Sequence, residues 1–130
     1  MNGNGSNGVA LLVARVLMAA IFISAGFSKI GGYDGAQAYM QSGGVPGILL
    51  PLVILLELGG GLALLVGFKT RWVALALGAF CIASALLFHM KFGDRAQTTN
   101  FMKNLSMAGG FLALYVAGAG KLSWDGRGSR

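Results

Sequence analysis

The sequence predicts an all-α integral membrane protein, an antiparallel bundle of four transmembrane helices with a short surface helix between the first two spans. Hydrophobic residues make up 55% of the 130 residues and charged residues only 11%, whereas a soluble domain carries about 25% charged residues. The mean hydropathy of +0.71 is also high. Four segments are apolar over the length of about 20 residues that a spanning helix needs. None of them alternates with the period of two that a β-barrel strand requires.

The elements follow one another along a single transmembrane domain, residues 9–120, between a flexible opening at 1–8 and a polar tail at 121–130. Between the first two spans, the segment YDGAQAYMQS has Asp34 as a candidate N-cap and ends before two glycines, which predicts a short surface helix. The short link GFKTR makes the second and third spans antiparallel neighbours. The four spans are expected at about residues 9–27, 48–66, 72–90 and 104–120.

Two opposite charges fall inside the predicted spans, Arg15 in the first and Glu57 in the second. A charge near mid-helix costs about 2.5–3.5 kcal/mol on insertion scales, and pairing reduces that cost. Counted from the end that holds the termini, the two residues differ in depth by only about 4–5 Å at 1.5 Å per residue. We therefore predict an Arg15–Glu57 ion pair, with Tyr115 of the fourth span in the same polar layer. A purely structural role and a role in binding or proton handling both stay open.

Glycines are expected to shape the packing around this layer. Gly60 and Gly61 lie three and four residues after Glu57, so they share its helix face and let a neighbouring backbone come close. Gly109 begins a similar stripe of small residues on the fourth span.

A second polar group is expected at the opposite mouth of the bundle and comprises Lys29, His89, Lys103 and Asn104. His89 titrates near neutral pH, so this group could bind a ligand or relay protons. The structural alternative is that the lysines reach lipid headgroups while His89 and Asn104 cap helix ends.

Several functional classes find no support in the sequence. One histidine and one cysteine match no common metal-ligand set, and no nucleophile lies beside a base. The net charge is +6, but the basic residues are scattered, which argues against a nucleic-acid surface. Five Lys or Arg residues fall on the side of the termini and four on the other, a slight bias that predicts cytoplasmic termini.

The ordered set of polar residues and motifs resembles the DoxX family of small bacterial inner-membrane proteins. The likeness covers Val9 to Asp125, and GAGK departs mildly from the family's usual GPGR. It implies four transmembrane helices in a bacterial inner membrane but no single activity. The family name comes from a subunit linked to thiosulfate:quinone oxidoreduction, and some relatives are associated with thiol redox and oxidative-stress complexes. The resemblance is carried by Arg15, Lys29, LLELGGGLALLVGFKTRWVAL with Glu57, LLFH with His89, NFMKNLSMAGGFLAL and GAGKLSWD.

From the residues and the resemblance together we expect an accessory subunit of a redox or quinone-linked membrane complex. It would bind a small apolar ligand, a quinone or a lipid, or a partner near the Arg15–Glu57 pair. Its partners would be the lipid bilayer, oxidoreductase subunits and further copies of the chain, without nucleic acid. No catalytic or cofactor-ligating motif favours an enzyme acting on its own. The alternatives are a small proton-linked transporter or permeability factor, and a purely structural or assembly protein.

Overall fold

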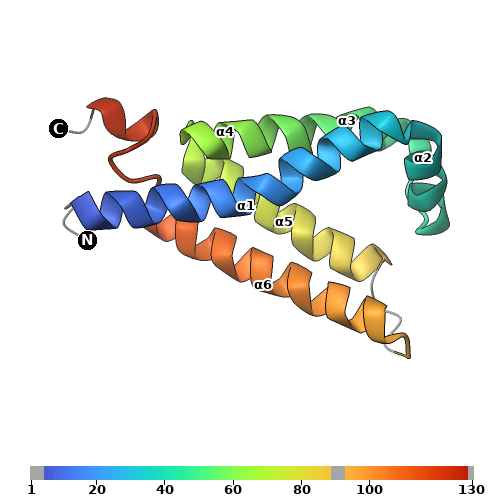
Figure 1. Ribbon diagram of the computed structural model, residues 1–130. Coiled ribbons are helices and arrows are strands. Elements are labelled where there is room, and N and C mark those ends of the chain that lie inside the picture. The colour runs from blue at the N-terminus through green and yellow to red at the C-terminus, as the bar shows by residue number, and fades with distance from the viewer. Residues whose placement is uncertain (1–4, 89–92, 129–130) are drawn as a thin grey trace.

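The structure, a computed structural model, describes residues 5–88 and 93–128. In that part of the chain every regular element is helical, and both ends of the chain lie at one end of the bundle, with α2 at the other (Figure 1). The elements in chain order are α1 (Gly5–Gly31), α2 (Tyr33–Ser42), η1 (Gly47–Leu49), α3 (Leu50–Ile54), η2 (Leu55–Gly59), α4 (Gly60–Val66), α5 (Thr70–Phe88), α6 (Arg95–Ala117) and η3 (Asp125–Gly128).

The second predicted span is a continuous rod that runs from η1 to α4. Pro51 stands in the first turn of α3, where its missing N–H would have no helical partner in any case. The rod ends at Gly67, whose φ of 76° is left-handed, and Phe68 N–H donates to the Ala63 carbonyl as in a Schellman turn. Because the link to α5 is so short, the rod and α5 run antiparallel, as predicted.

Three helical segments are long and apolar enough to span a bilayer: Asn7–Gly31, Gly47–Val66 and Thr70–Phe88. They correspond to the first three predicted spans, and α1 already begins at Gly5, inside the opening predicted to be flexible. The fourth long helix, α6, has 23 residues and packs along α5, but its first turns, RAQTTN, are polar. The all-α membrane fold with a short helix after the first span is thus confirmed.

The core is small, as expected for helices that face lipid. Only 22–28% of each candidate span is buried inside the protein, so most apolar side chains are left for the bilayer. The buried cluster lies where α1, α4, α5 and α6 meet. It consists of Ala19, Phe22, Leu64, Ala74, Leu77, Cys81, Phe111 and Leu114.

Gly60 and Gly61 lie at close helix contacts, as predicted, but the packing role predicted for Gly109 is wrong. A Cβ atom on Gly61 would lie 2.8 Å from Ile23 Cγ1 of α1, and one on Gly60 would lie 3.2 Å from Leu77 of α5. A Cβ atom on Gly109 would meet nothing within 4 Å among the described residues, because the helix turns Gly110 instead toward α1. One residue shifts the direction on a helix by about 100°, so a stripe read from spacing alone can miss its partner.

Candidate functional site

The predicted Arg15–Glu57 pair is wrong, because Arg15 bonds to main-chain carbonyls near the ends of the chain. Its side chain is fully buried. Nη1 donates to the carbonyls of Leu64 and Leu65 at 3.1 and 2.9 Å. These carbonyls lie in the last turn of the rod, where no helical N–H group four residues further on bonds to them. Nε and Nη2 donate to Ala119 and Leu122 at 3.2 and 2.5 Å. Arg15 therefore ties the segment after α6 to α1 and α4.

The direction of helical side chains explains this outcome. Cα–Cβ bonds tilt toward the N-terminus of their own helix. Arg15 on α1 therefore reaches toward the end that holds the termini, whereas Glu57 lies on a rod of opposite direction and reaches toward α2. Two residues at similar depth on antiparallel helices can thus point apart.

Glu57 pairs instead with Lys29, from the last turn of α1. Lys29 Nζ lies 2.9 Å from Oε1 and donates a hydrogen bond to Oε2 at 3.2 Å. The Glu57 side chain is 5% exposed and that of Lys29 is 29% exposed. Oε1 has the ion-pair contact but no well-directed hydrogen bond from any described residue. The carboxylate is thus held by one cation and retains capacity to accept another donor.

The backbone around Glu57 is unusual. Leu55–Gly59 forms a π-helical turn with Glu57 at its centre, and such turns inside α-helices occur frequently at functional sites. Next to it α1 comes very close, since a Cβ atom on Gly26 would lie 2.5 Å from Leu58 Cγ and 3.3 Å from its backbone nitrogen. Gly26 is three residues before Lys29, so this close approach positions the lysine over the carboxylate.

A cavity of about 510 Å³ adjoins the ion pair. Its walls come from α1, α2, the rod and α5, and they are mainly apolar. On one side the rings of Tyr39 and Phe88 stack with their centroids 4.8 Å apart. Met40 of α2 and Phe80 of α5 contribute further apolar surface. Sequence reasoning missed this cavity, because it depends on where α2 meets the last residue of α5, at the contacts of Tyr39 and Gly43 with Phe88.

The other predicted site residues lie elsewhere. Tyr115 is 37% exposed, and its main-chain carbonyl accepts a hydrogen bond from Arg71 Nε at 3.0 Å. The predicted polar layer is not formed, because Glu57 pairs with Lys29 and Arg15 bonds to carbonyls of other residues. Of the predicted polar mouth, His89 lies outside the described residues. Lys103 is exposed and Asn104 half-buried, while Lys29 is taken up by Glu57.

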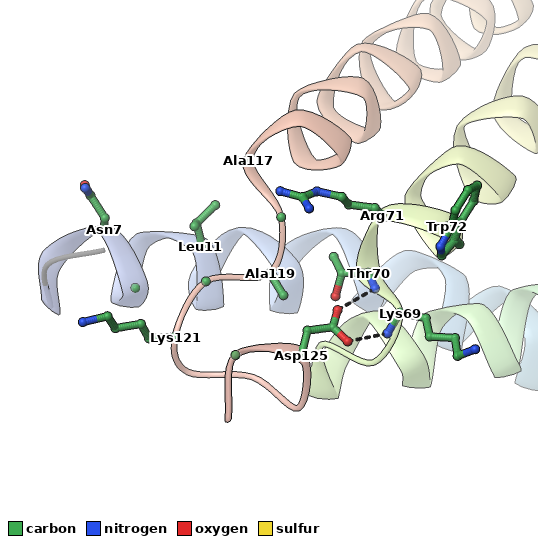
Figure 2. A pocket seen from close by; sticks show the side chains of 14 residues that line it. Asn7, Leu11, Lys69, Thr70, Arg71, Trp72, Ala117, Ala119, Lys121 and Asp125 are labelled. Carbon is green, nitrogen blue, oxygen red and sulfur yellow. Dashed lines mark hydrogen bonds between the residues drawn. The ribbon is translucent and has the colours of Figure 1, made fainter. Parts of the chain in front are cut away.

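The end of the bundle that holds the termini has its own polar site, which the sequence analysis did not predict. The carboxylate of Asp125 accepts hydrogen bonds from the backbone N–H groups of Lys69 and Thr70, both at 2.8 Å, at the start of α5 (Figure 2). Burial alone would raise the pKa of Asp125, but these hydrogen bonds and the charge of Arg15 lower it below its ordinary value. Asp125 thus caps α5 from a distant part of the chain.

The arrangement offers an ammonium and a carboxylate beside an apolar cavity. Among residues 5–88 and 93–128, no three His, Cys, Asp or Glu side chains gather where they could hold a metal ion. Cys81 is a buried free thiol inside the apolar core. What the structure does bring together is a lysine, a carboxylate and an apolar cavity within the spanning helices.

Comparison with known proteins gives related membrane proteins. The chain is 54% identical over 117 residues to "Inner membrane protein YqjF" of Escherichia coli (strain K12), with 90% of each chain covered. It is 36% identical over 126 residues to "Inner membrane protein YphA" of the same organism, covering 92% of this chain and 90% of that protein.

A more distant relative is "Putative oxidoreductase CatD" of Bacillus subtilis (strain 168), 28% identical over 88 residues, covering 68% of this chain and 66% of that protein. No solved structure matches the chain. The family model described as DoxX matches residues 10–90, which include Arg15, Lys29 and Glu57. This chain therefore belongs to the DoxX family.

Proposed function

We propose that this protein is an accessory subunit of a redox or quinone-linked complex in the bacterial inner membrane. It binds a small amphipathic molecule, a quinone or a lipid, in the cavity beside Lys29 and Glu57. One observation carries the proposal: a mainly apolar cavity of about 510 Å³ adjoins a buried ion pair at a π-helical turn. The names of the relatives, "Inner membrane protein" for two of them and "Putative oxidoreductase" for the third, support this setting.

The chemistry of the cavity suits a ligand with an apolar body and a polar head. Ligand cavities are typically about 300–1,000 Å³, mostly apolar, with a few polar groups that fix orientation. An ammonium has more donors than the one hydrogen bond that Lys29 gives to Glu57. Lys29 can therefore donate to a carbonyl oxygen of a quinone, and Glu57 Oε1 can accept from a hydroxyl of the quinol. The stacked rings of Tyr39 and Phe88 offer a wall for a planar head.

The test measures the ligand directly. The protein is purified from native membranes in mild detergent, and quinones and lipids are extracted and quantified by mass spectrometry. Lys29→Met and Glu57→Gln should each lower the retained ligand, whereas Lys103→Met, at an exposed lysine that does not line the cavity, should leave it unchanged. Repeated recovery of ligand-free wild-type protein that also fails to bind added ubiquinone would overturn the proposal.

A proton-linked transporter is the second candidate, favoured by the buried carboxylate whose Oε1 has no hydrogen bond from the described residues. Intramembrane acids often serve as proton relays. In proteoliposomes, pH-driven proton flux should then fall sharply in Glu57→Gln. Equal flux in wild type and variant would remove this candidate and leave ligand binding untouched.

A further inference from the structure

A second cavity, of about 690 Å³, opens at the end of the bundle that holds both termini (Figure 2). It is formed by the start of α1, the start of α5 and the segment that follows α6. The candidate spans Asn7–Gly31 and Thr70–Phe88 begin there, so the cavity lies where the bilayer surface is expected. We propose that it binds the phosphate group of an anionic lipid headgroup.

Besides Lys69, two cations from different parts of the chain line this cavity: Arg71 at the start of α5 and Lys121 after α6. Within the described residues, neither forms an ion pair with a carboxylate, and Lys121 Nζ has no hydrogen-bond partner. Basic pockets between transmembrane helices are typical sites for the phosphates of anionic lipids. Phosphate is the group that most readily accepts from both a guanidinium and an ammonium.

The guanidinium of Arg71 is already oriented. Its Nε donates to the Tyr115 carbonyl at 3.0 Å. It also rests against the backbone at Gly118, where φ is +77° and a Cβ atom would lie 3.1 Å from Nη2. The anchoring of Nε leaves the terminal nitrogens available as donors and reduces the conformational entropy lost on binding.

One acid also lines the cavity, but it does not cancel these charges. Both oxygens of Asp125 accept backbone hydrogen bonds from Lys69 and Thr70. Arg15 further compensates its charge. The side chain of Lys69 extends away from Asp125 and from Lys121 in Figure 2, so it is not counted among the phosphate donors. The net charge of the side chains that line the cavity is therefore positive.

The surroundings favour a lipid over free phosphate as the source of that group. Trp72, which lines the cavity, is 70% exposed, and Leu122, which follows the lining residue Lys121 in the chain, is 50% exposed. Exposed Trp at the end of a span is typical of the membrane interface. An acyl chain attached to the bound phosphate would cover these side chains.

The experiment measures lipid binding to delipidated protein by native mass spectrometry. Phosphatidylglycerol should bind more tightly than phosphatidylcholine. Arg71→Gln and Lys121→Gln should each weaken phosphatidylglycerol binding about fivefold, the amount expected for one basic residue near an anionic surface. The control Lys103→Gln removes an exposed lysine that lies outside the cavity and should change nothing.

A parallel titration uses inorganic phosphate. Competition by phosphate at millimolar concentration, lost in the same two variants, would support the phosphate site and identify a soluble source. If Arg71→Gln lowers the melting temperature through loss of the Tyr115 contact, Lys121→Gln carries the test, because its Nζ bonds to no described residue. Equal affinity for the two lipids, or equal weakening by Lys103→Gln, would overturn the proposal.

Discussion

The Lys29–Glu57 ion pair makes a sharp prediction about energetic coupling. At the observed 2.9 Å, Coulomb's law gives a gross attraction of about 6 kcal/mol with an effective dielectric constant of about 20. Desolvation of Glu57 and the partial exposure of Lys29 offset most of it, so we expect a net coupling of about 1–3 kcal/mol. In the cycle Lys29→Met, Glu57→Leu and both together, the double variant should therefore be less destabilised than the sum of the single variants.

The matched control is the same cycle with Arg15→Met in place of Lys29→Met. Arg15 bonds to carbonyls and not to Glu57, so these two changes should add to within about 0.5 kcal/mol. The free energy of unfolding is measured by steric trapping or denaturant titration in bicelles, where the spanning helices keep an apolar environment. Coupling between Arg15 and Glu57 of more than about 1 kcal/mol, with none between Lys29 and Glu57, would refute the assignment.

Three further predictions concern the packing and the chain end. Arg15→Met alone should cost about 3–5 kcal/mol of unfolding free energy in the same assay, because it strands several buried carbonyls at once. Asp125→Ala should cost about 1 kcal/mol as a lost helix cap and should speed hydrogen exchange of the first α5 amides. Because the pKa of Asp125 is lowered in the folded protein, its contribution to the free energy of unfolding is full above about pH 4 and is lost as the pH falls through that lowered value. In a pH series of melting temperatures, Asp125→Asn should abolish this loss. Gly26→Ala should cost about 1–3 kcal/mol through overlap with Leu58, whereas Gly109→Ala, with open space beside it, should raise the melting temperature; equal effects would contradict the packing described.

The overall fold was predictable because hydropathy sums over many residues. A run of about 20 apolar residues specifies a spanning helix whatever its detailed contacts, and three such runs appear as helices at the predicted places. The start of α1 was not predictable, since Gly5 and its neighbours have no helix-forming preference. There the helix lies against the segment after α6, since a Cβ atom on Gly8 would be 3.8–4.0 Å from Lys121 and Leu122, so tertiary contact overrides local propensity.

The partners of the charged residues could be predicted only in part. Depth along the span brought Arg15 and Glu57 to the same level, but depth ignores the direction in which each side chain leaves its helix. From its position in the sequence, Lys29 was expected at the end of the bundle opposite the termini, together with Lys103. The Lys29 side chain instead reaches the carboxylate of Glu57. The π-helical turn around Glu57 has no clear sequence signal that would have corrected this.

The tilt of helical side chains gives a rule that the sequence alone could have used. A charged residue within a span reaches toward the N-terminal end of its own helix. Lys29 lies closer to α2 than Glu57 does, so on their antiparallel helices the two side chains point toward each other. Arg15 lies closer to the chain termini than Glu57 does, so these two side chains point away from each other. This divergence separates the two charges into different tasks: Arg15 closes the chain end on main-chain carbonyls, and Glu57 is left with a lysine beside an apolar cavity.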